Sequence, residues 1–262
     1  MIELARRLSP LAELTIVAPE GPRSASSHSI TLHKPLRLES ARAFPWLADA
    51  IEPHAAYTCS GSPTDCVMLG VLEVLKERPP HLVVSGINDG QNLAEDVTYS
   101  GTVAAAMEGA ILGLPSVAVS LDHRGEGHFA TASHFLAELI RRLFFGDVHA
   151  DGDVWPPVDA AKSLARHGGK LFLNVNVPDL PTERVKGLKL CRTGFRGYHD
   201  VVQKMQDPRG QPFFWIAGER VLEDARERTD VKALEDGWVS VTPLTWEMNF
   251  EPGFDSLSPL FE

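Results

Sequence analysis

The sequence has few cysteines, fewer basic than acidic side chains and no long apolar run, and each shortage narrows the choice of function. Cys59, Cys66 and Cys191 form no CxxC pair and no zinc-binding spacing, which favours free thiols in a reducing cytoplasm over a redox or zinc site. Lys and Arg number 25 against 35 Asp and Glu, so no nucleic-acid polymer is expected as a partner. No apolar stretch approaches the ~20 residues of a membrane span. We therefore expect a cytoplasmic protein that contacts no membrane.

Short apolar runs alternate with helical patterns along the first two thirds of the chain. Strands are predicted at Leu14–Pro19, His81–Ser85, Pro115–Ser120 and Leu171–Val177, and helices at Met1–Leu8, Thr64–Lys76, Thr102–Leu112 and Ala130–Phe145. Near-continuous apolar strands that alternate with helices are typical of a parallel sheet covered on both faces. The sequence therefore predicts an α/β fold, with a doubly wound, Rossmann-like and largely parallel sheet.

The pattern changes after Pro178. Strands are predicted at Phe213–Ile216 and Trp238–Thr242, joined by a charged segment from Glu219 to Asp236. Residues 146–169 are predicted to loop over the surface, with a helical turn at Ala160–Arg166. We divide the chain into a core, residues 1–190, and a C-terminal unit, residues 191–262, that holds a β-hairpin or arm and a terminal strand. The arm is expected to mediate oligomerisation.

Polar clusters follow the predicted strands, where ligands bind in doubly wound sheets. Ser24–Ser29 offers hydroxyls and an imidazole for phosphate or for a metal shell. Ser85–Asn92 combines glycines with Asn side chains, whose carbonyls suit Mg²⁺ or Mn²⁺. Tyr99–Thr102 precedes a helix whose start favours phosphate. Each cluster also fits an ordinary turn or helix cap, and in the similar turn at Ser60–Asp65 capping is the preferred role of Asp65.

The order and spacing of these clusters resemble the SurE family. The run SGINDGQNLAEDVTYSGTVAAAMEGAILGLPSVAVS is similar to the family pattern SGxNxGxN…DVxYSGTV…EGxxxGxPSxAxS almost without gaps. RSASSHSIT, CSGSPTDCV and DGWVSVTPL resemble further family motifs in the family order. Long spaced motifs of this kind are far more specific than a lone GxGxxG. The chain is therefore identified by resemblance as a SurE-like protein.

The resemblance implies a metal-dependent 5′(3′)-nucleotidase that removes phosphate from nucleoside monophosphates with Mg²⁺ or Mn²⁺. It also implies a homodimer or homotetramer. Among the histidines, one near the implied site is the candidate general acid. The matching positions are Ser24 and Asn88 for the metal and Asn92, Ser100, Gly101 and Thr102 for the substrate phosphate, and His28 is the candidate general acid because it lies close to them.

One family motif has no counterpart. An NDDG loop with two metal-binding aspartates should follow an opening strand, but this sequence starts in the helix after that loop and contains no Asp-Asp pair. Two neutral oxygen ligands bind a hard dication poorly, because carboxylate charge supplies much of the affinity. Absence of the strand would also leave two neighbouring strand edges exposed. We therefore expect the chain as written to be inactive.

Two alternatives stay open. The first is a non-catalytic nucleotide-binding or scaffold protein that keeps the fold without the metal. The second is a Rossmann-type oxidoreductase, which is disfavoured because no GxGxxG follows a predicted strand.

Overall fold

The computed structural model describes residues 2–40, 55–145, 147–148, 154–155, 171–224 and 226–249. Its main sheet has five strands in the order β4-β5-β8-β12-β9. β4, β5 and β8 run parallel, β12 is antiparallel to β8, and β9 is parallel to β12. The strands are β4 Val83–Asp89, β5 Ser116–Asp122, β8 Phe172–Pro178, β9 Leu188–Leu190 and β12 Val239–Pro243. The predicted α/β fold with a largely parallel sheet is confirmed.

A second sheet has three strands in the order β1-β3-β2. β1 (Thr15–Pro19) runs parallel to β3 (Ala55–Cys59), and β2 (Leu38–Ser40) is antiparallel to β3. Within the described residues β1 pairs only with β3, and β4 pairs only with β5. A groove of about 1880 Å³ is lined by both β1 and β4. Within the described residues β1 and β4 thus each have one edge without a strand partner, on either side of this groove.

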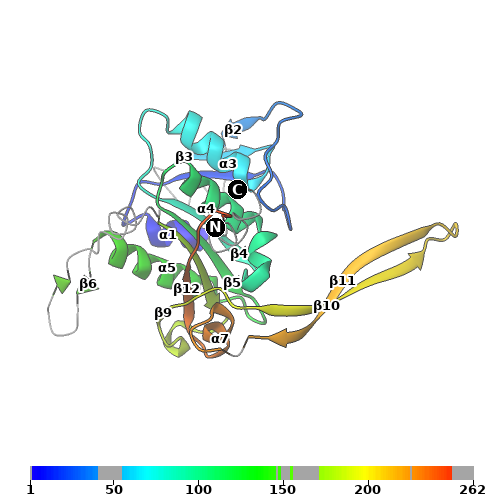
Figure 1. Cartoon of the computed structure of the whole chain (residues 1–262). Helices are drawn as coiled ribbons and strands as arrows, with labels where there is room; N and C mark the ends of the chain where they lie inside the picture. The colour runs from blue at the N-terminus through cyan, green and yellow to red at the C-terminus, as the bar shows by residue number, and fades with distance from the viewer. Residues whose placement is uncertain are drawn as a thin grey trace, which may run out of the picture.

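Helices cover both faces of the main sheet (Figure 1). α1 (Ile2–Leu8) and α5 (Phe129–Phe144) pack on one face, and α4 (Gly101–Ile111) packs on the other. In the part of the chain that the structure describes, no helix combines the length and the apolar character that a membrane crossing needs. The other helical elements of the described residues are α3 Pro63–Leu69, the π-helical turn η2 Gly70–Val74, the 3₁₀ turns η3 Ala94–Thr98 and η4 Thr182–Arg184, and α7 Asp230–Glu235.

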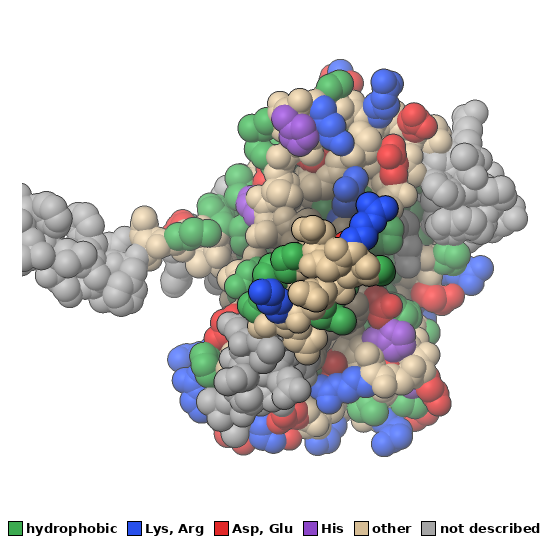
Figure 2. All heavy atoms as spheres, turned by 90° about the vertical axis from the view of Figure 1, so that its right-hand side faces the viewer, with side chains coloured by type: hydrophobic (Ala, Val, Ile, Leu, Met, Phe, Trp, Pro, Cys, Tyr) green, Lys and Arg blue, Asp and Glu red, His purple; other side chains and the backbone are tan. Residues whose placement is uncertain are grey.

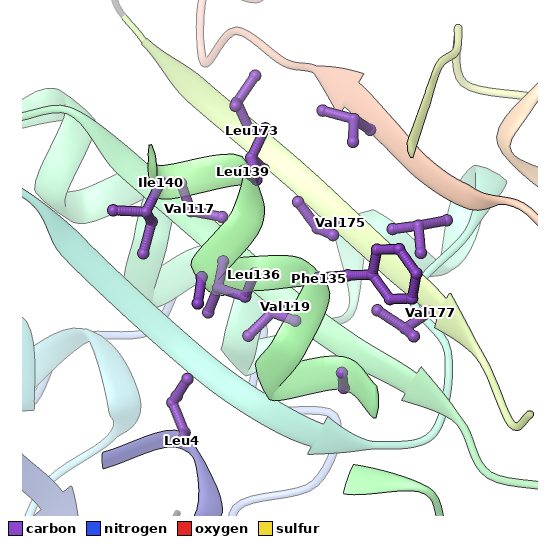
Figure 3. Close-up of a cluster of buried hydrophobic side chains, with 14 of the residues drawn as sticks. Leu4, Val117, Val119, Phe135, Leu136, Leu139, Ile140, Leu173, Val175 and Val177 are labelled. Carbon is purple, nitrogen blue, oxygen red and sulfur yellow. The ribbon is translucent and has the colours of Figure 1, made fainter. Parts of the chain in front are cut away.

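Strand alternation decides which side chains meet each helical layer. On β5 and β8 even-numbered positions face α4, where Ala118 and Phe172 pack with Val103. The small residues of α4 permit a close approach to the sheet, since a Cβ on Gly109 would lie 2.5 Å from Ser116 Oγ. Odd-numbered positions pack with α1 and α5: Val117, Val119, Leu121, Leu173, Val175 and Val177, of which all but Leu121 are labelled in Figure 3.

The C-terminal part divides differently from the prediction. β10 (Arg196–Gln206) and β11 (Pro212–Glu223) form an antiparallel hairpin that projects from the core (Figure 1). The segment predicted as a charged connection, Glu219–Asp236, instead completes β11 and contains α7. β10 could not be predicted from the sequence, because a two-stranded ribbon with no buried face needs no apolar run. The terminal strand β12 lies inside the main sheet between β8 and β9.

The predicted surface loop at residues 146–169 also contains regular structure. β6 (Asp147–Val148) pairs with β7 (Val154–Trp155) in an antiparallel ladder. Two-residue strands are too short to give an alternation signal. The predicted helical turn at Ala160–Arg166 lies outside the described residues.

Candidate active site

Six of the seven residues selected from the sequence line one cleft. This cleft is the part of the groove beyond the carboxyl ends of β1 and β4, where ligands sit in doubly wound sheets. The structure therefore brings these six side chains or backbones together, while their chemical roles stay predictions. The six are Ser24, Asn88, Asn92, Ser100, Gly101 and Thr102.

The start of α4 points its polar groups at this cleft. Ser100 is the N-cap, and its Oγ accepts a hydrogen bond from Val103 N at 3.1 Å. Thr102 Oγ1 donates to Asn88 Oδ1 at 3.1 Å, which ties the helix to the end of β4. Asn88 Nδ2 donates to the carbonyl of Gly90 at 2.8 Å. The first N–H groups of an 11-residue helix have no partner within the helix, so this end can bind an anion.

The serine-rich loop sits on the start of α4. Ser27 N donates to the carbonyl of Tyr99 at 3.0 Å, and Ser27 Oγ donates to the carbonyl of Thr98 at 2.8 Å. A Cβ at position 101 would lie 2.3 Å from Ser26 Oγ, so only a glycine at this position lets the loop come this close to the helix. The loop that carries Ser24 is thereby held against the helix start.

Asp65 caps a helix rather than entering the cleft. Ser62 N donates to Asp65 Oδ2 at 2.8 Å, and Asp65 N donates to Ser62 Oγ at 3.1 Å, which together form a capping box. Thr31 adds a backbone N–H bond of 3.0 Å and a hydroxyl bond of 2.7 Å. Burial alone would raise the pKa of Asp65, but these bonds from Ser62 and Thr31 lower it. The predicted capping role is confirmed.

His28 does not line the cleft. Its Nε2 lies 2.8 Å from Glu108 Oε2, on a later turn of α4. The preceding Ser27 has a φ of 49°, in the left-handed region. The structure thus gives His28 a structural partner, and its proposed role as general acid stays a prediction without support from the geometry.

Two carboxylates line this part of the cleft, and both are engaged. Asp89 Oδ1 lies 2.5 Å from His123 Nδ1, and this hydrogen bond raises the pKa of His123. Asp96 Oδ2 accepts a bond from Arg196 Nη1 at 3.3 Å. Within the described ranges, no three His, Cys, Asp or Glu side chains are grouped so that they could hold a metal ion.

The described donors do not fit a hard dication on their own. Ser24 offers a neutral hydroxyl, and Asn88 offers a neutral amide oxygen that already accepts the Thr102 hydroxyl. Mg²⁺ and Mn²⁺ bind preferentially where at least one or two carboxylates contribute charge. A metal site at this edge therefore needs carboxylates beyond those that the structure places there.

Sequence reasoning missed the polar groups beneath the cleft. Asn174 and Asn176 of β8 bond the main chain of Asn92, and Ser120 of β5 bonds its side chain. A signal for them existed, because Asn at alternate positions of the buried run LFLNVNV places two amides on one face of a strand.

Comparison with known proteins decides the family. The family model described as survival protein SurE matches residues 1–200. The chain belongs to the SurE family. The 5′-nucleotidase SurE of Gloeobacter violaceus is 42% identical to it over 245 residues, which is 93% of this chain and 83% of that protein. The 5′-nucleotidase SurE of Aeromonas hydrophila is also 42% identical, over 94% of this chain and 86% of its own length.

A solved structure agrees with this assignment. The crystal structure of the SurE protein from Aquifex aeolicus superposes on the chain with a TM-score of 0.71 and 36% sequence identity. The match covers 99% of this chain and 93% of that one. The family resemblance inferred from the sequence motifs is confirmed.

Proposed function

We propose that this SurE protein is a phosphohydrolase that removes phosphate from nucleoside 5′-monophosphates, with 3′-monophosphates as further substrates. The observation that carries the proposal is the cleft at the start of α4, in a chain whose relatives are named 5′-nucleotidases. The helix start supplies N–H donors for phosphate oxygens, and Ser100 and Thr102 add hydroxyls beside them. A nucleoside monophosphate is therefore the substrate class.

The bond between Thr102 and Asn88 gives phosphate binding a second consequence. Thr102 Oγ1 has one proton, which it donates to Asn88 Oδ1 in the free protein. A bound phosphate oxygen accepts that proton instead, and Asn88 Oδ1 is then released as an oxygen ligand. Phosphate binding and the availability of Asn88 are thus coupled through one hydroxyl.

A divalent cation, Mg²⁺ or Mn²⁺, is the proposed cofactor. When bound, such a cation supplies charge for the phosphoryl oxygens and an activated water. Ser24 and Asn88 are the ligands that this chain offers, and the carboxylates that a hard dication needs would come from an added NDDG loop. Because the described donors do not suffice, a non-catalytic nucleotide-binding or scaffold protein is the second candidate. Release of phosphate from AMP with Mn²⁺, measured on the chain with such an NDDG loop added, separates the two candidates.

AMP binding tests the proposed site directly. AMP should raise the melting temperature of the chain, whereas adenosine should not, because the cleft contacts are made to phosphate. Thr102→Val should weaken AMP binding about tenfold, the loss expected for one hydrogen bond to a charged group. Titration calorimetry with AMP and adenosine measures both effects.

Thr98→Val is the matched control. Thr98 Oγ1 bonds the carbonyl of Glu95 at 2.8 Å, and Thr98 does not line the cleft. This variant should bind AMP as the unchanged chain does. Equal affinities for AMP and adenosine, or equal effects of the two Thr→Val changes, would contradict the proposed site.

The three cysteines support a cytoplasmic location. Cys59, Cys66 and Cys191 are all buried free thiols. Burial raises the pKa of Cys66 and of Cys191, which makes both poor nucleophiles at neutral pH. Free thiols of this kind persist in a reducing compartment.

The hairpin β10–β11 is the proposed oligomerisation element of a homodimer or homotetramer. Figure 2 views the molecule from the side toward which the hairpin projects, and hydrophobic side chains lie there beside Lys and Arg. Ile216 is 90% exposed and Trp215 62% exposed, which is unusual for side chains of this size. Among the hairpin side chains that the structure describes, Val202, Met205, Phe213 and Phe214 are also exposed hydrophobic residues.

Ile216→Glu combined with Trp215→Glu should therefore reduce the molar mass measured by size-exclusion chromatography with light scattering to that of a monomer. The two carboxylates would be buried without partners in an apolar contact. Gln211→Glu, in the exposed turn of the same hairpin, adds charge without removing apolar surface and should keep the larger mass. An unchanged mass in the double variant would exclude the hairpin as the interface.

A further inference from the structure

The main chain of Asn92 is held by hydrogen bonds from the side chains of two other asparagines. Its N–H donates to Asn176 Oδ1 at 2.8 Å, and its carbonyl accepts from Asn176 Nδ2 at 3.0 Å. Asn174 Nδ2 donates to the same carbonyl at 2.8 Å. One asparagine side chain therefore bonds both polar groups of the Asn92 main chain, as a neighbouring strand would.

The side chain of Asn92 is oriented as well. Its Nδ2 donates to Ser120 Oγ at 2.7 Å, and this bond holds the amide group in place. Asn92 is itself buried, with 7% exposure, and it lines the cleft. The direction of its amide at the cleft is thus set from below by β5 and β8.

The two asparagines on β8 belong to the rigid part of the fold. Asn174 and Asn176 are both fully buried, and alternation puts them on the face of β8 that carries α4. β8 pairs with β5 on one side and β12 on the other, so neither asparagine can shift without the sheet. Buried amides at these positions are costly unless they are bonded, and most of their bonds go to Asn92.

We propose that Asn174 and Asn176 are positioning residues of the phosphate site, which act through Asn92. They hold the segment between β4 and η3 at a fixed height above the sheet, so that the Asn92 amide meets the phosphate that binds at the start of α4. Neither residue lines the cleft. This inference rests on the proposed function, because it takes a nucleoside monophosphate as the ligand.

Asn176→Ala should raise the dissociation constant for AMP about tenfold. The change removes the two bonds that the Asn176 side chain makes to the Asn92 main chain, so the Asn92 side-chain amide is no longer held toward the ligand. Asn92→Ala should have an effect of the same size. The double variant should be no worse than Asn92→Ala alone, because residues that act through one another are not additive. Titration calorimetry with AMP measures all three variants.

Ser240→Ala is the matched control. Ser240 lies opposite Asn176 in the β8–β12 register, is fully buried, and has a hydroxyl without a partner in the described part of the chain. This variant should keep the affinity of the unchanged chain for AMP. It perturbs the same sheet position without touching Asn92, so it separates positioning from general destabilisation.

Amide hydrogen exchange gives a second readout that needs no ligand. The Asn92 N–H should exchange at least about tenfold faster in Asn176→Ala than in Ser240→Ala, because only the first change removes its acceptor. Unchanged Asn92 exchange in Asn176→Ala would overturn the positioning role, and so would additive losses of AMP affinity in the double variant. Failure of the unchanged chain to bind AMP would instead overturn the proposed function, and the positioning role with it.

Discussion

Addition of an apolar strand and an NDDG loop before α1 should raise the phosphatase activity of the chain. With AMP and Mn²⁺, phosphate release should rise at least about 100-fold, because water activation by a cation needs a site that holds it. The loop would place two carboxylates beside Ser24 and Asn88, which supply neutral oxygens only. Those carboxylates provide the charge that a hard dication requires.

The groove between β1 and β4 gives the same addition a structural effect. Both strands run parallel to their sheet partners, and each has an edge without a partner in the described residues. An inserted strand would pair with both edges and cover apolar side chains of the groove such as Leu4, Ile16 and Val84. We expect the stability to rise by several kcal/mol from burial and new backbone hydrogen bonds. Thermal unfolding would show this as a higher melting temperature.

A strand followed by an NAAG loop separates the two effects. This control should give the same rise in melting temperature, since its strand is identical, but no gain in phosphate release. Comparable turnover by the chain without any addition would show that other residues supply the metal site. The assignment of Ser24 and Asn88 would then have to be abandoned.

The core of the fold could be predicted because its strands are buried on both faces. All seven residues of β5 and of β8 are buried, and such strands appear in the sequence as continuous apolar runs. The cleft lies at the carboxyl ends of two other predicted strands, β1 and β4, which is why Asn88, Ser100 and Thr102 could be grouped from the sequence. The family motifs then suggested which of these residues would bind metal and which would bind phosphate.

Contacts between polar side chains that are distant in the sequence could not be predicted in this way. Arg196 reaches Asp96 across 100 positions, and His123 reaches Asp89 across 34. No local periodicity encodes such pairs, because they depend on how loops pack after the sheet has formed. His28 shows the same limit: an imidazole suits a general acid, but the structure pairs this one with Glu108.

Asp179→Asn should produce the largest loss of stability among single substitutions at a loop. The carboxylate follows β8 directly, and its side chain is 5% exposed. Oδ2 accepts N–H bonds from Arg124 at 3.1 Å, Gly125 at 2.9 Å and Gly127 at 3.3 Å. Oδ1 accepts from both the N–H and the Nδ1 of His128, at 2.8 Å each.

These bonds cap α5 from another part of the chain. His128 is the N-cap of α5 but makes no side-chain cap bond of its own, so Asp179 supplies the negative charge at that helix start. An amide in place of the carboxylate would turn an N–H group toward backbone N–H donors. We expect a loss of about 3 kcal/mol at pH 7, or on the order of 8 °C in melting temperature.

The pH dependence of this loss identifies its cause. Burial alone would raise the pKa of Asp179, but the N–H and ring of His128 and the other N–H groups hold it well below its usual range. A carboxyl with a depressed folded-state pKa contributes its full stability above its unfolded pKa of about 4 and loses it as pH falls below that value. The difference in melting temperature between the unchanged chain and Asp179→Asn should therefore be constant from pH 7 to about pH 5 and shrink below about pH 4.

Asp207→Asn is the control for this measurement. Asp207 Oδ1 also accepts two backbone N–H bonds, from Arg209 at 2.8 Å and Gln211 at 2.9 Å, but it lies in the exposed turn of the hairpin. Its replacement should change the melting temperature by less than about 2 °C, because water can replace bonds at an exposed turn. A loss in Asp179→Asn that did not diminish at acid pH would mean that shape rather than charge holds the loop before α5.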